Sequence, residues 1–248
     1  MAEGVRETVQ GVTVPKDYQF LNPGDSFAFT CPEECWGTCC SATTIRVDPW
    51  DVLRLVRGTG VETGEILKFC QLYQGQKTPL PVVSLVRHGR CPFLLLDGSC
   101  AVYPFRPRVC RYFPVGEMIV LNEQGAVERR YFLIRSRRCK GFGGRIVYTV
   151  EDWLHQEGLE VARAMGEQFS RFLRDAGEKL QWSSWVTEED VQELLHLLYD
   201  LDAVRERYRL PDGLADRELY AWCLDRAWCY LLERAPAAVA PVGREKTV

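Results

Sequence analysis

Beyond residue 149, apolar side chains recur at steps of three or four residues, which is the spacing of a helix that buries one face. The periodic positions include Leu154, Val161, Met165, Phe169 and Phe172, and later Val191, Leu194, Leu195 and Leu198. Two segments of the form Thr-x-x-Asp, at Thr149 and Thr187, have the spacing of capping boxes that begin helices. A third helix is predicted over residues 214–233, so we expect this part of the chain to be helical.

Helix signals are sparser before residue 149. Asp48-Pro49 has the form of a helix start. The helix that follows would carry three apolar residues on one side, Trp50, Leu53 and Val56. We expect Gly58 and Gly60 to end it, and we predict a further helix over residues 66–72.

Other segments of the first half have the pattern of short strands. The predicted strands cover residues 82–86, 91–96, 99–103, 118–121 and 126–134. Asp97-Gly98 is a strong hairpin signal, residues 103–114 are too rich in proline for long regular structure, and the glycines at 141–144 predict a turn. The expected fold is therefore α+β, with an irregular region of short helices and β-hairpins followed by a helical C-terminal segment.

Charge divides the chain at the same place. Residues 1–148 hold 19 Lys and Arg against 14 Asp and Glu, whereas residues 149–248 hold 12 against 20. We therefore expect a first unit over residues 1–148 and an acidic helical segment, residues 149–248, packed on it. The formal net charge of −3 disfavours nucleic acid as a partner.

No feature of the sequence predicts a membrane or an export signal. No apolar run approaches the roughly 20 residues that cross a bilayer, and the first twenty residues contain no apolar core of a signal peptide. The expected location is the cytoplasm, where thiols stay reduced. Eleven cysteines in such a chain point to metal binding or catalysis rather than to disulfides, and the odd total would leave at least one unpaired.

Four of these cysteines lie within ten residues, at positions 31, 35, 39 and 40. On a helix beginning at Pro32, Cys31, Cys35 and Cys39 would lie along one stripe, whereas Cys40 would point about 100° away. Neighbouring thiolates repel one another, and a bound metal removes that cost. The diverging directions of Cys39 and Cys40 favour ligation of different metals or different irons.

A second group consists of Cys91, Cys100, Cys110 and Cys139, of which the first two flank the predicted hairpin turn. Residues 87–145 hold 12 basic and 4 acidic side chains, a charge that would stabilise thiolates and bring the two groups together. The eight cysteines could form two four-thiolate sites, one cluster with spare thiols, or one polynuclear site. Tetrahedral thiolate sites suit zinc or an iron–sulfur cluster, and the dense spacing favours the cluster, specifically [4Fe–4S].

The remaining candidates are weaker. Cys70, Cys223 and Cys229 are interpreted as buried thiols without a ligand role. The histidines, His88, His155 and His196, lack a partner at motif spacing, and His88 is the best placed as an extra ligand. Three arginines, Arg106, Arg108 and Arg111, could bind phosphate, nucleic acid or an acidic peptide, but we favour compensation of thiolate charge and turn capping.

The ordered motifs resemble the YkgJ-type cysteine-cluster family. They are Cys31-x3-Cys35-x3-Cys39-Cys40, Cys91-Pro92-Phe93-Leu94, Asp97-Gly98-x-Cys100-x-x-Tyr103, Arg106-Pro107-x-x-Cys110-Arg111-x-x-Pro114, and Cys139. The resemblance covers residues 27–145, although the usual opening of the family is tighter, C-x2-C-x2-C-C. It implies a zinc- or iron-chelating domain in which all eight cysteines are ligands. Flagellin lysine-N-methylase is a relative of that family.

Three functions follow as expectations. The first is a metal-binding protein that holds an iron–sulfur cluster or zinc. The second, implied only by the family relationship, is an enzyme that modifies a protein side chain, as a lysine N-methylase does. The third is a zinc-stabilised module that recruits a protein partner. The sequence identifies no catalytic residue and no site for an organic cofactor.

Overall fold

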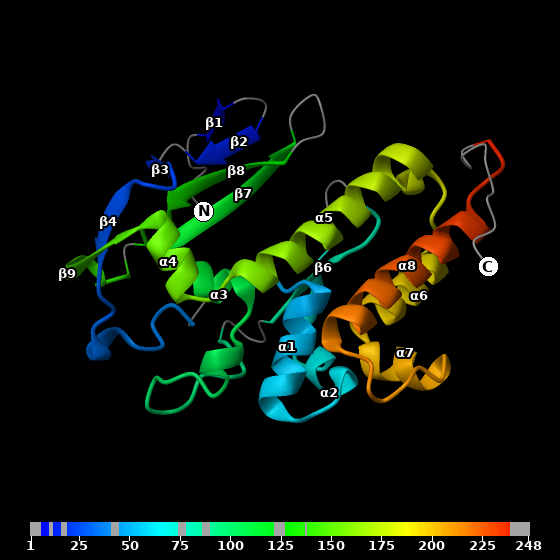
Figure 1. The fold of residues 1–248 in the computed structure, drawn as a ribbon, viewed down its shortest axis with the longest axis horizontal. Coiled ribbons are helices and arrows are strands. Elements are labelled where there is room, and N and C mark those ends of the chain that lie inside the picture. Colours follow the sequence, from blue (N-terminus) through cyan, green and yellow to red (C-terminus); the bar gives the residue numbers. More distant parts are fainter. Residues whose placement is uncertain are drawn as a thin grey trace.

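The computed structural model describes residues 6–9, 12–15, 19–40, 45–73, 78–85, 90–121, 127–136 and 138–238. Small antiparallel sheets lie on one side of the molecule and a layer of helices on the other (Figure 1). The fold is therefore mixed α+β, as predicted, with a helical C-terminal segment. No helix within the described ranges is long and apolar enough to cross a membrane.

The strands pair into four small sheets. One sheet has the order β3–β8–β7, and the others pair β1 with β2, β4 with β9 and β5 with β6. Their bounds are β1 (Arg6–Val9), β2 (Val12–Pro15), β3 (Gln19–Leu21), β4 (Ser26–Phe29), β5 (Gln71–Tyr73), β6 (Val82–Ser84), β7 (Val115–Leu121), β8 (Val127–Leu133) and β9 (Phe142–Thr149). The β7–β8 pair confirms the predicted second hairpin, whose turn at 122–125 lies outside the described residues.

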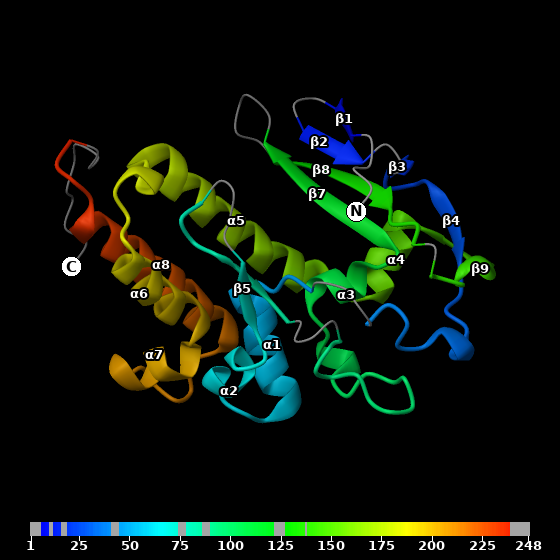
Figure 2. The ribbon, with the colours of Figure 1, turned by 180° about the vertical axis from the view of Figure 1, so that it is seen from behind.

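The helices include one α-helix of 21 residues, α5, and several of one or two turns. Their bounds are α1 (Pro49–Thr59), α2 (Thr63–Leu67), α3 (Arg108–Tyr112), α4 (Val150–Gln156), α5 (Glu160–Leu180), α6 (Glu188–Tyr199), α7 (Leu201–Arg207) and α8 (Asp216–Arg234). Three single 3-10 turns are η1 (Glu33–Cys35), η2 (Tyr103–Phe105) and η3 (Trp182–Ser184). Figure 2 shows α5, α6 and α8 side by side, with α7 and α2 below them.

Two helix starts are closed by the capping boxes that the sequence predicts, and a third box closes the start of α1. Thr149 and Thr187 each accept a hydrogen bond from the backbone N–H three residues later, and the aspartate there bonds back. Asp48 does the same with Asp51 at the start of α1. The matching hydrogen bonds satisfy N–H groups that have no partner inside the helix, so these local signals fix the boundaries.

Helix α1 packs with α5, α6 and α8, although it precedes them by more than 100 residues. Trp50 meets Tyr220 of α8 edge to face at 5.6 Å between ring centroids, and Tyr220 donates a hydrogen bond to the carbonyl of Met165 in α5. Arg57 pairs with Asp216 at the start of α8 at 2.7 Å. The apolar core therefore continues from the first half of the chain into the helical segment.

Aromatic side chains join α4 to the sheets. The Trp153 ring lies against Phe27, Phe29 and Tyr148 from β4 and β9, at centroid distances of 5.1 to 5.9 Å. Its indole N–H donates to the carbonyl of Tyr112 at 3.0 Å, at the end of α3. This contact fixes α3 between the sheets and the helices.

Three local predictions are wrong. The helix expected over residues 66–72 ends at Leu67, and Gln71–Tyr73 forms β5 because it pairs with β6. The hairpin expected from strands over 91–96 and 99–103 is wrong as well: both segments consist of turns with one bridge, Leu94 to Cys100, and η2 begins at Tyr103. The glycines at 141–144 lead into β9 rather than a turn; a Cβ on Gly144 would lie 2.6 Å from the Thr30 nitrogen, so glycine is needed for close strand approach.

The first helix departs slightly from expectation. Gly58 lies inside α1, and Gly60 ends it with φ of +71°. The left-handed conformation of Gly60 is typical of a helix C-terminus. A Cβ on Gly58 would overlap the ring of Phe105, so its absence lets η2 pack on α1.

Candidate metal centre

The cysteine segment after β4 is a series of tight turns rather than a helix. Only Glu33–Cys35 forms a 3-10 turn, which Pro32 precedes in extended conformation. Gly37 then adopts φ of +77°, which a right-handed helix does not allow. The predicted stripe of Cys31, Cys35 and Cys39 along one helix is therefore wrong, because the chain turns at Gly37.

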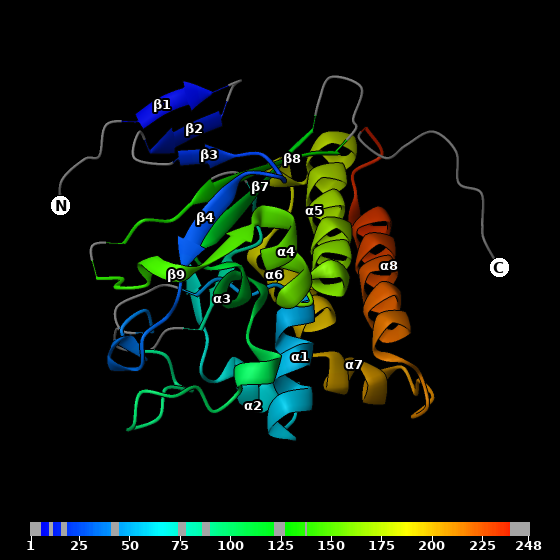
Figure 3. The same cartoon turned by 60° about the vertical axis from the view of Figure 1, so that its left-hand side comes forward.

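The loop that contains Cys91 and Cys100 lies against this segment (Figure 3). The Cys91 N–H donates to the Cys40 carbonyl at 2.9 Å. Gly98, with φ of +85°, approaches so closely that an added Cβ would lie 2.9 Å from the carbonyl oxygen of Trp36. The Asp97-Gly98 turn thus brings the second group of cysteines to the first, as the charge pattern predicts.

Cys110 and Cys139 reach the same region from different elements. Cys110 lies in α3, where its N–H donates to the Pro107 carbonyl at 2.9 Å. Cys139 lies just before β9, and its sulfur accepts the Gly141 N–H at 3.4 Å. The Cys35 thiol contacts the neighbouring Arg138 carbonyl at 3.9 Å. All eleven cysteines lie in the described part of the chain, and each is a free thiol.

Electrostatic interactions group the eight thiols into two sets that overlap at Cys39, which also repels Cys91. Partial burial raises the pKa of Cys31, and repulsion from three other thiols raises it further; these are Cys35, Cys39 and Cys139. Burial also raises the pKa of Cys139, with further repulsion from Cys35 and Cys39. We name this group the outer set: Cys31, Cys35, Cys39 and Cys139.

The other four form a second set. Burial raises the pKa of the Cys110 thiol, and repulsion from Cys91 and Cys100 adds to that effect. The pKa of Cys40 is raised first by its hydrogen bond with Cys39, then by burial and by repulsion from Cys39, Cys91 and Cys110. We name this group the inner set: Cys40, Cys91, Cys100 and Cys110.

Cys39 and Cys40 form the junction of the two sets. Their sulfur atoms lie 3.9 Å apart. The hydrogen bond from the Cys40 thiol lowers the pKa of Cys39 to about 6, against the opposing effect of burial, and the Arg106 guanidinium lowers it further. Cys91 repels both thiols, whereas Cys31 and Cys139 repel Cys39 and Cys110 repels Cys40. The two residues therefore share one neighbour and differ in the others.

Arg106 supplies positive charge to both sets. It lowers the pKa values of Cys31, Cys39 and Cys110, although the net shifts of Cys31 and Cys110 remain upward. Its guanidinium lies over the Tyr103 ring at 3.8 Å from the centroid and pairs with Glu157 at 3.0 Å. At this position the interpretation of the arginines as compensating thiolate charge agrees with the structure.

The donor chemistry fits zinc or iron, since eight thiols and a nearby guanidinium suit cations that prefer thiolate. As the side chains stand, the described residues contain no group of three or more Cys, His, Asp or Glu arranged to hold a metal ion. Ligation by either set therefore requires its thiols to move closer together.

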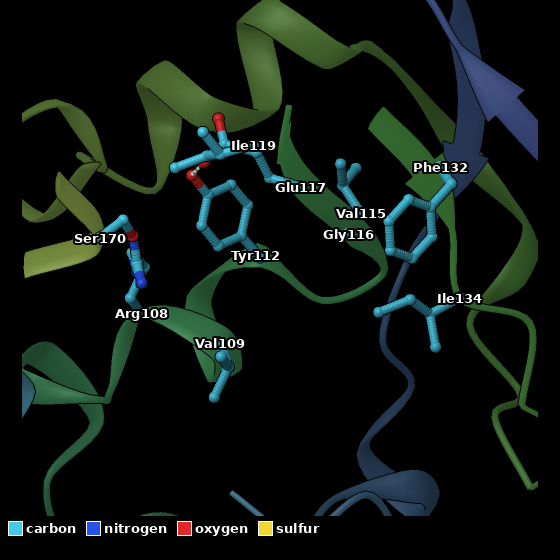
Figure 4. Close-up of a pocket in the computed structure, with 10 residues that line it drawn as sticks. All are labelled: Arg108, Val109, Tyr112, Val115, Gly116, Glu117, Ile119, Phe132, Ile134 and Ser170. Atoms are coloured by element: carbon cyan, nitrogen blue, oxygen red, sulfur yellow. Dashed lines mark hydrogen bonds between the residues drawn. The ribbon is translucent and has the colours of Figure 1, made fainter. Parts of the chain in front are cut away.

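A pocket of about 460 Å³ lies beside α3, bounded also by β7, β8 and α5. Figure 4 shows Tyr112, Arg108 and Ser170 on one side and Val115, Phe132 and Ile134 on the other. No cysteine lines this pocket. Its polar side chains already have protein partners: Tyr112 donates to Glu117, Ser170 donates to the Gly166 carbonyl, and Arg108 faces Asp48.

The other cysteines and the two described histidines lie outside this centre. Cys223 is buried in α8, and burial raises its pKa and that of Cys70 to about 12. Cys229 is exposed on α8, so its prediction as a buried thiol is wrong: the side chain is on the solvent face of the helix. His155 is exposed in α4 and His196 is half-buried in α6, whereas His88 lies outside the described residues.

Two residues near the centre were not selected from the sequence as functional. The sequence indicates Asp48 only as a helix start and gives no functional signal for Asp51. Both are buried, and Asp51 accepts the backbone N–H of Arg108 at the start of α3. The Asp-Pro-x-Asp pattern is typical of a capping box such as that of α1, but it does not predict the contact with α3.

Residues 30–140 match a family model, CxxCxxCC, described as a "Putative zinc- or iron-chelating domain". The cysteine-bearing part of this chain is therefore similar to the CxxCxxCC family. The match includes every cysteine of the outer and inner sets, and ends before β9. No curated protein and no solved structure matches the chain. This match agrees with the cysteine-cluster resemblance of the sequence motifs. It indicates chelation of zinc or iron and does not distinguish between the two metals.

Proposed function

We propose that the protein binds metal through all eight cysteines, as two four-thiolate sets that meet at Cys39 and Cys40. The outer set would draw ligands from the segment after β4 and from Cys139. The inner set would combine Cys40 with the loop at 91–100 and with Cys110 of α3. The observation that carries the proposal is that free cysteines from segments far apart in sequence meet: the Cys91 N–H donates to the Cys40 carbonyl, and the Cys35 thiol contacts the carbonyl of Arg138, the residue before Cys139.

Thiol repulsion supports chelation for a physical reason. Burial and like charge raise the pKa values of Cys31, Cys40, Cys91, Cys110 and Cys139. The metal-free centre therefore disfavours thiolates, and a cation that neutralises them stabilises the fold as it binds. Arg106 reduces the remaining negative charge.

We favour an iron–sulfur cluster, [4Fe–4S], as the occupant. Structural zinc sites take paired C-x(2–4)-C segments on one ion, whereas here adjacent cysteines belong to different sets. A cluster takes one thiolate per iron and spreads its ligands more widely. Zinc in either set is the other outcome of the test. The centre would act in the cytoplasm, where thiols remain reduced.

The experiment is anaerobic purification of the full chain, followed by measurement of iron, zinc and acid-labile sulfide per chain. Iron with equimolar sulfide, and an absorption band near the visible range that bleaches on reduction, is the expected result. Zinc without sulfide would show that the occupant is zinc rather than a cluster, and the proposal of metal chelation would stand. A chain that takes up neither metal under reducing conditions would refute the proposal.

A further inference from the structure

Helix α3, which carries Cys110, is too short to hold its own position. It has five residues, and its N-cap is Pro107, which makes no side-chain capping hydrogen bond. Helices of this length are unstable alone because few hydrogen bonds offset the ordering of the chain. The position of the inner-set thiol on α3 must therefore be fixed by other elements.

Asp51 of α1 supplies the missing cap. Its Oδ1 accepts the Arg108 N–H at 2.7 Å, at the first residue of α3. Its Oδ2 accepts the Asp48 N–H at 3.2 Å, which closes the capping box of α1. Asp51 is only 3 % exposed, so one buried carboxylate holds the starts of two helices.

The side chain of Arg108 strengthens this connection. Its guanidinium lies 3.2 Å from Asp48 Oδ2, an oxygen that accepts no hydrogen bond from the described residues. A Cβ on Gly166 would overlap the same guanidinium, so Arg108 lies directly on the backbone of α5. The N-terminal end of α3 is thus fixed to both α1 and α5.

The opposite end of α3 is fixed to α4. Arg111 donates to the carbonyls of Glu157 and Gly158, and Trp153 donates to that of Tyr112. Asp51 supplies the contact at the N-terminal end, two residues before Cys110. Removing that contact would loosen this end, which the Arg108 side chain would still hold to Asp48 and α5, while the other end remains attached.

We propose that Asp51 is a positioning residue that places Cys110 in the inner set by capping α3. The expected effect of this placement on metal affinity rests on the proposed function, whereas the placement of Cys110 itself does not. Asp51 does not ligate metal; it acts through the backbone of Arg108. Its role in α3 is separable from its role in the capping box of α1, because the two use different carboxylate oxygens.

Asp190 provides a matched control. It is also a buried aspartate that closes a capping box, at the start of α6. Its spare oxygen, Oδ1, accepts from Tyr230 and Arg234 of α8 rather than from a cysteine-bearing element. Asp190→Ala therefore tests the loss of a buried box without disturbing α3.

The first test uses the metal-free full chain and a short pulse of iodoacetamide, with alkylation of each cysteine read by peptide mass spectrometry. In Asp51→Ala we expect Cys110 to react up to about tenfold faster relative to Cys223, the upper end of the effect of one lost hydrogen bond. Asp51→Asn retains one acceptor oxygen and should give a smaller increase. This second variant also serves if the alanine variant fails to fold.

The second test measures Zn²⁺ affinity of the same variants by competition with a chromophoric chelator. Asp51→Ala should bind about 10- to 100-fold more weakly, as for loss of a residue that orients a ligand, and Asp190→Ala should match the wild type. An unchanged Cys110 reaction rate in Asp51→Ala, or an equal increase in Asp190→Ala, would overturn the positioning role. A wild type that binds no metal would refute the proposed function instead, and the alkylation rates would still decide the role of Asp51.

Discussion

The helical part and the cysteine part of this molecule are stabilised in different ways. Helices α5, α6 and α8 bury full-length apolar side chains, among them Leu180, Leu194 and Leu231, with no exposed surface. The cysteine part consists of turns and single-turn helices, with Leu96 99 % and Trp36 50 % exposed. The helices can rely on apolar burial, whereas the cysteine segments rely on a few hydrogen bonds and, in the proposed function, on bound metal.

The largest effect expected in this comparison follows loss of one ligand from each set. Cys39→Ser and Cys110→Ser should each lose bound metal together with stability, because metal binding is coupled to folding of these segments. Metal content and thermal unfolding of the anaerobic protein measure both. Cys229→Ser, on the exposed face of α8, is the control and should keep both. Full metal retention in the two ligand variants would contradict the assignment.

A core substitution in α6 should produce the opposite pattern. Leu194 is completely buried, so Leu194→Ala should lower the free energy of unfolding by about 2–5 kcal/mol through lost burial and a residual cavity. Metal affinity at a temperature where the variant is folded should stay at the wild-type value. Chemical denaturation and metal titration test this pair of expectations; a parallel loss of affinity would mean that the two regions are not energetically separate.

Acid should destabilise the helical part through Asp190. Burial alone would raise its pKa, but hydrogen bonds from the Thr187 backbone, Thr187 hydroxyl and Tyr230, with the charge of Arg234, lower it to about 2 from an ordinary 3.8. The unfolded carboxyl therefore takes up a proton first, and about 2 kcal/mol of stability is lost as pH falls from about 4 to 2. Denaturant unfolding across this range should show a smaller decline for Asp190→Asn; equal declines would exclude this carboxylate as the cause.

The smallest expected effect concerns Arg106 in the cysteine part. The Cys40 thiol, a backbone N–H and, to a smaller extent, the Arg106 guanidinium lower the pKa of Cys39 to about 6 against the effect of burial. In metal-free Arg106→Gln, the midpoint of Cys39 alkylation against pH should therefore rise, and Arg106→Lys should retain most of the wild-type value. A midpoint in Arg106→Gln that equals the wild-type value would show that Arg106 does not lower the pKa of Cys39.

The same comparison explains which features could be predicted from the sequence. Signals for helix starts are local, so Thr149, Thr187 and Asp48 predicted helix boundaries that the structure confirms. The hairpin of β7 and β8 is local as well. Residues 71–73 were mispredicted as helix because β5 exists only through its pairing with β6, a contact with no trace in local periodicity.

The site was predictable in composition but not in shape. The family motifs and charge pattern predicted that the two cysteine groups meet, and the Cys91–Cys40 backbone contact agrees. The helical stripe was wrong because Gly37 adopts a positive φ. The cap that Asp51 gives to α3 joins residues 57 positions apart, so only the tertiary structure could reveal it.

X-ray absorption at the edge of the bound metal tests most directly whether cysteine thiolates alone enclose it. The anaerobic wild-type protein should show a first shell of sulfur alone, at about 2.3 Å for zinc or with an iron–iron shell beyond it for a cluster. A first shell dominated by nitrogen or oxygen would contradict the account.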